Sequence, residues 1–426
     1  MSPAETLLRQ MFDAAVAAAN PDLVVPPFMP QKPSGRVIIL GAGKASAAMA
    51  RAAETHVLNN WGLIPDGLVV TQYGAGVACR HVEIVEASHP VPDANGMAAA
   101  GRILALASAA DEGDLVLFLV SGGGSALLPL PGEGLSLDDK QIVNRALLKC
   151  GATIHEMNVV RKHLSAIKGG RLAAAAYPAR LVTLGISDVP GDDFGTIASG
   201  PTIADPSTAA DALAILARYK IDLPENVKAF LRSKRAESPD PSAACFAAAE
   251  AILVAKPQAS LEASADVARQ SGYTPVILGD AIEGEAKDVG LVMAGIAKQV
   301  RTYQQPVAPP VALISGGETT VSVNGPAGRG GRNTAFLLSF AMAANDMTGV
   351  SALACDTDGI DGTQDNAGAV YLPGDIALGQ AAGRRAVEDM TGFDSYSFFE
   401  ALDRLVMTGP TRTNVNDLRV ILIDPV

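Results

Sequence analysis

The sequence is poor in the residues that most often build metal centres and disulfide frameworks. It has only four cysteines, five histidines and 4% aromatic residues in 426 positions. The cysteines, at positions 79, 150, 245 and 355, form no CxxC pair, and the histidines form no cluster. A redox motif, a disulfide scaffold and a histidine-based metal site are therefore not expected, and reduced thiols indicate a cytoplasmic protein.

Long apolar runs and an excess of basic residues are also missing. No stretch of about 18 apolar residues predicts a membrane span, and the first 20 residues lack the pattern of a signal peptide. The formal net charge is −12, which argues against nucleic acid or an anionic membrane surface as a partner. The paired HRD and DFG motifs of protein kinases do not occur together, and the GxSxG elbow and the HExxH zinc motif are missing.

What the chain does have is a regular alternation of apolar strands and helical segments. Hydrophobic residues make up 48% of the chain and charged residues 18%. In the first half, near-continuous Val, Ile and Leu runs predict strands within 36–43, 66–72, 81–88, 114–123 and 179–188. Runs of this kind, separated by helices, predict an α/β fold with a parallel sheet covered on both faces. Ligands of such sheets bind beyond the carboxyl ends of the strands.

The length predicts two domains. A polar, proline-bearing stretch at 233–245 suggests the boundary. We therefore expect one domain over 1–240 and a second over 241–426. The second contains shorter strands, which predict a smaller α/β domain with a mixed sheet; its predicted strands lie within 250–256, 274–280, 309–323, 349–362 and 417–424.

The segment VIILGAGKAS places a lysine just after a strand and a glycine turn. Ile38 and Ala45 stand where a Walker A loop requires glycine and Ser or Thr, so the segment is not that motif. A lysine at the opening of a helix opposes the helix dipole unless an anion lies nearby. Gly41, Gly43 and Lys44 are thus candidates for phosphate binding, with a purely structural turn as the alternative.

A second glycine-rich loop follows the strand at 114–120. Its backbone N–H groups and two hydroxyls could surround a phosphate, although a flexible turn explains the pattern equally well. The candidate phosphate-binding residues are Ser121, Gly122, Gly123, Gly124 and Ser125. The segment ISGGETTVSV at 314–323 repeats the pattern and adds Glu318.

Two charged segments could serve the same ligand. Residues 158–171 set Arg161 and Lys168 near one helical face, either to contact an anion or as an ordinary solvated face. Arg332 lies in a glycine-rich segment before a helix, with Asn333 beside it, and an arginine there suits the charge of a phosphoryl group in transfer.

Aspartates crowd two loops. Asp188, Asp192 and Asp193 follow a strand, and such crowding is costly unless a cation neutralises it. They could hold Mg²⁺ together with substrate phosphates, or Asp188 or Asp193 could take a proton from an alcohol. Asp356 and Asp358 could assist the metal, but a turn-rich loop explains them nearly as well.

In this order, the motifs resemble one family, the class II glycerate 2-kinases, whose C-terminal region is the MOFRL domain, here about 310–420. The resemblance covers nearly the whole chain. It includes GAGKAS, ASHPVPDANG, SGGGSALL, NVVRKHLSAIKGGRLA, SDVPGDD, SGGET, GRGGRN, DTDGIDG and TGPTRTNVNDL. Arg412 departs from the glycine expected in the last motif.

The resemblance implies a Rossmann-like domain facing a smaller α/β domain across a cleft. It implies phosphorylation of D-glycerate at the 2-hydroxyl with ATP and a divalent cation, with Lys44 and Arg332 as functional residues and Arg161, Lys168, Glu318 and Asn333 near the substrate. The expected partners are this small substrate and the nucleotide, with a homodimer left open. Relatives have also been labelled hydroxypyruvate reductases, so an NAD(P)-dependent reductase and a non-catalytic sensor stay as alternatives.

Overall fold

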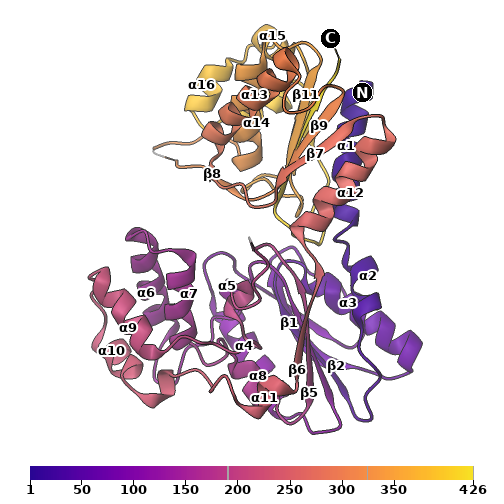
Figure 1. The fold of residues 1–426 in the computed structure, drawn as a ribbon. Coiled ribbons are helices and arrows are strands. Elements are labelled where there is room, and N and C mark those ends of the chain that lie inside the picture. Colours follow the sequence, from indigo (N-terminus) through magenta and orange to yellow (C-terminus); the bar gives the residue numbers. More distant parts are fainter. Residues whose placement is uncertain (190, 324, 426) are drawn as a thin grey trace. The chain divides into compact units, whose positions relative to one another are not determined.

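The computed structural model describes residues 1–189, 191–323 and 325–425 and divides into two compact units (Figure 1). The first unit spans 21–254, and the second combines 1–20 with 255–426. The structure thus differs from the boundary expected at 240/241. The chain leaves the first unit at 254/255, at the end of strand β6 (Ala249–Ala255), which extends the first unit's sheet beside β5. The polar stretch before β6 is therefore a connection within that unit.

The first unit contains the expected parallel sheet. Its strand order is β3-β2-β1-β4-β5-β6, and the pairings β1–β2, β2–β3, β1–β4 and β4–β5 are parallel. The strands before β6 are β1 (Val37–Ala42), β2 (Asp66–Gln72), β3 (Glu83–Ala87), β4 (Leu115–Val120) and β5 (Arg180–Ile186). The order reverses direction at β1 and β4, so the loops after these two strands lie at the point where doubly wound sheets bind ligands.

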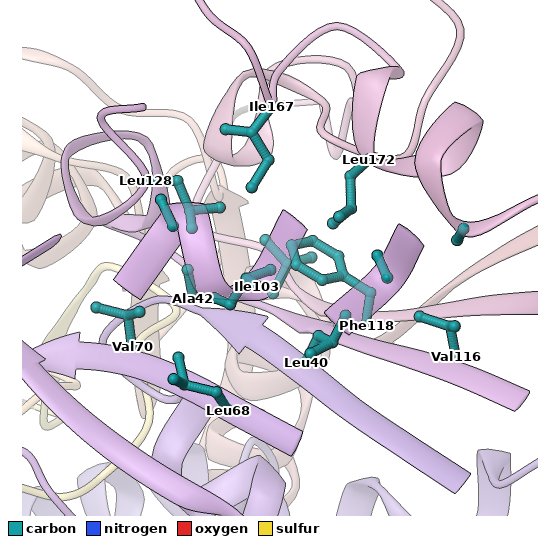
Figure 2. Close-up of a cluster of buried hydrophobic side chains, with 14 of the residues drawn as sticks. Leu40, Ala42, Leu68, Val70, Ile103, Val116, Phe118, Leu128, Ile167 and Leu172 are labelled. Atoms are coloured by element: carbon teal, nitrogen blue, oxygen red, sulfur yellow. The ribbon is translucent and has the colours of Figure 1, made fainter. Parts of the chain in front are cut away.

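Helices cover this sheet and also form a layer of their own. Against one face, Leu40, Val116 and Phe118 of the strands pack with Ile103 of α4 and Leu172 of α8, and all five are buried (Figure 2). A separate apolar cluster joins α6, α7, α9 and α10. The main helices are α3 (Ser46–His56), α4 (Ala94–Ser108), α5 (Gly124–Leu127), α6 (Leu137–Lys149), α7 (Ile154–His163), α8 (Arg171–Ala176), α9 (Ala209–Arg218) and α10 (Glu225–Leu231).

The second unit has the mixed sheet that the sequence predicts. Its order is β13-β12-β11-β14-β9-β7; β7–β9 is parallel and the other pairings are antiparallel. The strands are β7 (Thr274–Gly279), β9 (Val311–Ser315), β11 (Val350–Asp356), β12 (Gly368–Tyr371), β13 (Leu405–Val406) and β14 (Asp417–Ile423), with a small pair β8 (Gly284–Glu285) and β10 (Thr319–Thr320) beside them.

The N-terminal helix α1 (Pro3–Ala17) belongs to this second unit, contrary to the expected domain 1–240. Its apolar face, with Leu8, Met11 and Phe12, packs with Leu261 of α12 and Val420 of β14 in one buried cluster. The other helices of the unit include α12 (Pro257–Gln270), α13 (Ala286–Tyr303), α14 (Arg332–Ala344), α15 (Asp375–Ala381), α16 (Ala386–Thr391) and α17 (Ser395–Glu400). None of the helices that the structure describes has the length and hydropathy to cross a membrane.

Candidate active site

The turns after β1 and β4 are clamped together. The N–H of Lys44 donates to the Gly122 carbonyl at 2.8 Å, and the N–H of Ala45 donates to Ser121 Oγ at 2.9 Å. Gly43 has φ +144°, and a Cβ there would lie 2.2 Å from Ser121 Oγ, so only glycine allows this approach. Ser121 is fully buried. Its hydroxyl therefore positions the turn.

Lys44, His89 and the glycine loop converge at this point. A Cβ on Gly123, which has φ +80°, would lie 3.1 Å from His89 Nε2 and 3.3 Å from Lys44 Cγ. The N-cap residue of helix α3, Ala45, directly follows Lys44 and provides no side-chain cap. The helix N-terminus and the lysine thus add positive potential at the same place, which favours an anion. Sequence reasoning missed His89, although it lies in one of the family motifs.

Lys168 is a buried side chain that contacts two segments beside the site. Its side chain donates to the Ser125 carbonyl at 2.7 Å, to Ser125 Oγ at 2.9 Å and to the Ala198 carbonyl at 3.4 Å. Burial lowers the pKa of Lys168 well below its ordinary value. The solvated-face alternative is therefore wrong for Lys168, which is only 2% exposed.

The segment that Lys168 contacts has a strained backbone. Ala198 and Ser199 have φ values of +51° and +60°, a region that residues other than glycine rarely adopt. Ser199 is held by Ser125 Oγ at 2.9 Å and donates to Asn158 Oδ1 at 3.1 Å. Such strain persists where surrounding contacts enforce it, and it is common at ligand-binding sites.

In the aspartate loop after β5, the Asp193 carboxylate has a structural role. Both oxygens of Asp193 accept hydrogen bonds within the loop, from the Gly195 N–H at 2.9 Å and from Thr196 Oγ1 at 2.8 Å. Asp193 therefore stabilises the turn, a role separate from the ligand role considered for Asp188 and Asp192. Among the described residues, no group of three His, Cys, Asp or Glu side chains is placed to hold a metal ion. A cage built from protein ligands alone is thus not present in the described part of the chain.

In the second unit, Arg332 opens α14 within a ring of carboxylates. It donates to Asp356 at 2.6 Å, to Glu318 at 2.8 Å and to Asp417 at 2.9 Å. Burial by itself lowers the pKa of Arg332, but Asp417, Asp356 and Glu318 together raise it above its ordinary value. The guanidinium is therefore permanently charged and held in a fixed orientation.

The neighbours of Arg332 support this arrangement. Asn333 is fully buried and donates to Asp417 Oδ1 at 2.8 Å, so its side chain positions that carboxylate. Asp361 accepts from the N–H groups of Asn333 and Thr334 and caps α14. Asp358 Oδ1 accepts from the Ile360 N–H at 2.9 Å, as a turn-forming aspartate does. Sequence reasoning missed Asp417, whose contacts arise only from the fold.

Each unit also contains a pocket near these residues. In the first, a pocket of about 610 Å³ includes Asn158, Lys162 and Asp193 in its lining. In the second, one of about 660 Å³ includes Glu318 and Arg332 together with apolar side chains such as Met390. Both volumes lie within the range of small-molecule sites.

Comparison with known proteins identifies the family. A family model described as a domain of unknown function, DUF4147, matches residues 7–232, and the MOFRL family model matches 311–417. The D-glycerate 2-kinase of Thermotoga maritima is 41% identical over 96% of both chains. The chain belongs to the class II glycerate 2-kinase family. This confirms the resemblance on which the expectations were based.

Other members of the glycerate 2-kinase family extend the comparison. The crystal structure of glycerate kinase from Thermotoga maritima has a TM-score of 0.89 and 39% identity and covers 99% of both chains. A relative from Agrobacterium vitis is 53% identical over 99% of this chain and 94% of its own, but carries a provisional hydroxypyruvate reductase name. Names within the family thus disagree on the reaction.

Proposed function

We propose that this chain transfers a phosphoryl group from ATP to the 2-hydroxyl of D-glycerate, giving 2-phosphoglycerate. The observation that carries the proposal is the near-complete coverage of the chain by relatives named glycerate kinase, in sequence and in structure. The pattern of charged residues supports it, because phosphoryl transfer depends mainly on positioning and on neutralising charge.

The reductase alternative needs a dinucleotide site, and the first unit lacks two of its features. The third glycine of the fingerprint is replaced by Ser46, which is buried and donates to the Leu119 carbonyl at 3.1 Å. The acidic residue that binds the ribose belongs at the carboxyl end of β2. Here that end is Thr71 and Gln72, whereas Asp66 pairs with Ile38 at the opposite end.

In the proposed reaction, Lys44 neutralises the oxygens of the transferring phosphoryl group, and the turns at Gly41, Gly43 and 121–125 allow the phosphates to approach the backbone. Arg332 stabilises charge that develops during transfer. Glu318 and Asn333 act on the substrate indirectly, as members of the group of side chains that surrounds Arg332. Asp188 contacts or deprotonates the 2-hydroxyl.

The proposed metal is Mg²⁺ or another divalent cation carried on ATP. Mg²⁺ needs only one or two protein carboxylates when phosphates supply other ligands, so the lack of a three-residue cage in the described chain is compatible with it. Asp188 and Asp192 would hold it; Asp356 is already bonded to Arg332. The ion would neutralise phosphate charge.

The test compares the alternatives in one preparation. D-glycerate with ATP and Mg²⁺ is assayed for 2-phosphoglycerate, and hydroxypyruvate is assayed with NADH and with NADPH. We expect phosphorylation and no cofactor oxidation. Turnover of hydroxypyruvate alone would replace the proposal with a reductase. Ligand binding without turnover in either assay would indicate a sensor.

A further inference from the structure

Three cationic side chains of the first unit gather beside the glycine loop with only neutral partners. Lys140 comes from α6, Arg161 from α7, and Lys168 from the loop before α8. Lys140 donates to the Leu130 carbonyl at 3.2 Å. Arg161 donates to Asn144 Oδ1 at 2.7 and 2.9 Å and to Asn158 Oδ1 at 3.4 Å.

A connected set of hydrogen bonds links these side chains, which places them close together. Asn144, the partner of Arg161, lies one helical turn after Lys140 on α6, and so on the same face. The Leu130 carbonyl that accepts from Lys140 also accepts from Ser165 Oγ at 3.1 Å, and Ser165 Oγ in turn accepts from the N–H of Lys168. Lys168 then reaches Ser125 of the glycine loop.

The charge of this group is uncompensated within the described chain. No described carboxylate forms an ion pair with Lys140, Arg161 or Lys168, whereas the neighbouring Lys162 lies 3.3 Å from Asp205. Burial, followed by repulsion from Arg161 and Arg171, lowers the pKa of Lys140 to about 7. Clustered cations in a protein of net charge −12 are costly unless an anion joins them.

Two asparagine side chains add further donors beside these cations. Asn158 Oδ1 accepts from both Arg161 and Ser199, and Asn144 Oδ1 accepts from Arg161. Their amide NH₂ groups therefore remain donors, and neither is used in a described hydrogen bond. Lys140, Asn144 and Arg161 are partly exposed, so a ligand can reach them. Two cations with two amide donors match the oxygens of a carboxylate or a phosphate.

We propose that Lys140 and Arg161, assisted by Asn144 and Asn158, form the subsite that binds the carboxylate of the three-carbon substrate. Lys168 is the positioning residue that fixes Ser125 and Ala198 beside this subsite. The inference rests on the proposed function, because D-glycerate supplies the carboxylate. The carboxylate is favoured over a nucleotide phosphate because Lys44 and the N-terminus of α3 already provide a phosphate site.

The experiment measures binding separately from turnover. Titration calorimetry records D-glycerate, hydroxypyruvate and ADP binding to the parent, to Lys140→Met and to Lys140→Arg. The control is Lys149→Met, which removes an exposed lysine from the same helix. Charged hydrogen bonds of this kind change affinity by about tenfold or more. We expect that loss for D-glycerate in Lys140→Met, with ADP affinity unchanged and Lys140→Arg close to the parent.

The outcomes separate the subsite from the reaction. Lower affinity for ADP with unchanged affinity for D-glycerate in Lys140→Met would overturn the subsite, because the cations would then hold the nucleotide. Equal affinities in the parent and Lys140→Met would overturn it as well. If the parent reduces hydroxypyruvate and fails to phosphorylate D-glycerate, but Lys140→Met loses hydroxypyruvate binding, the subsite stands and the proposed function falls.

Discussion

The lysines beside the glycine loop differ in what surrounds them, and this assigns them different tasks. Lys168 is 2% exposed and donates to three protein acceptors, so its charge acts through the backbone that it holds. Lys44 is partly exposed, next to Gly123 and His89, at an uncapped helix N-terminus. Of the two, Lys44 is the one whose charge can meet a transferring phosphoryl group.

We therefore predict that Lys44→Ala lowers kcat by about 10² or more, because it removes a cation that stabilises charge in the transition state. The free energy of unfolding should change little, because the hydrogen bond that joins the two turns uses the backbone N–H of Lys44 and not its side chain. Steady-state kinetics and thermal unfolding of the same samples test this. Near-parental kcat would contradict the assignment.

The aspartate loop provides a second prediction. Asp188→Asn should lower kcat and raise the Mg²⁺ concentration needed for half-maximal activity, because a metal ligand or base has lost its charge. Asp193→Asn is the matched comparison: both of its oxygens serve the local turn, so it should lower stability with little change in Mg²⁺ dependence. Identical Mg²⁺ curves for Asp188→Asn and the parent would exclude a metal role for Asp188.

The pKa of Lys140 predicts a pH dependence. Burial and two nearby cations, Arg161 of α7 and Arg171 of α8, hold this pKa at about 7. Only the protonated lysine attracts a carboxylate, so KM for D-glycerate should rise as pH increases above about 7. Arginine keeps its charge there, and Lys140→Arg should flatten the rise. Superimposable pH profiles for the two proteins would contradict this explanation.

At the scale of elements, the site depends on how closely two strand ends approach. The turn at Gly43 tolerates no side chain, because a Cβ would lie 2.2 Å from Ser121 Oγ and φ is +144°. Gly43→Ala should therefore destabilise the protein by about 2 kcal/mol or more and lower activity with it.

Gly295→Ala is the control for this substitution. Gly295 lies within α13, and its Cβ would meet no atom within 4 Å. Replacing it should stabilise the helix by about 0.5–1 kcal/mol. Chemical denaturation of both variants measures the two changes. A stability loss at Gly43 no larger than the scatter of the assay would show that the turn can open.

For the whole molecule, the N-terminal helix joins sequence ends that lie far apart in the chain. Met11 of α1 is fully buried among residues of α12, β11 and β14. Met11→Ala should cost about 2–5 kcal/mol, because it leaves a cavity in that core. Hydrogen exchange should show lost protection in 257–270 and 350–356 while 37–42 keeps its protection.

Met407→Ala is the matched control, since Met407 is 53% exposed in the same unit. It should leave the exchange pattern unchanged. Lost protection at 37–42 in Met11→Ala, with 257–270 unaffected, would contradict the division of the chain into these two units.

Local pattern was enough to predict much of this protein. Unbroken apolar runs between helices indicate a buried parallel sheet, and β1 to β5 form one. Glycine and charge at strand ends indicated Lys44 and the loop at 121–125, because strand ends meet at one edge of such a sheet. The order of motifs was sufficient to identify the family.

Only the tertiary structure decided which unit each segment joins and which charges have partners. The local sequences of strand β6 and helix α1 do not show which unit each belongs to. Their assignment depends on strand pairing and side-chain packing with distant segments. Lys140 looks like an ordinary surface lysine in the sequence, and Asp417 stands at the start of the predicted strand 417–424 with no sign of its partner. Their environments come from α7, α8 and α14, and burial and electrostatic energy depend on such neighbours rather than on adjacent residues.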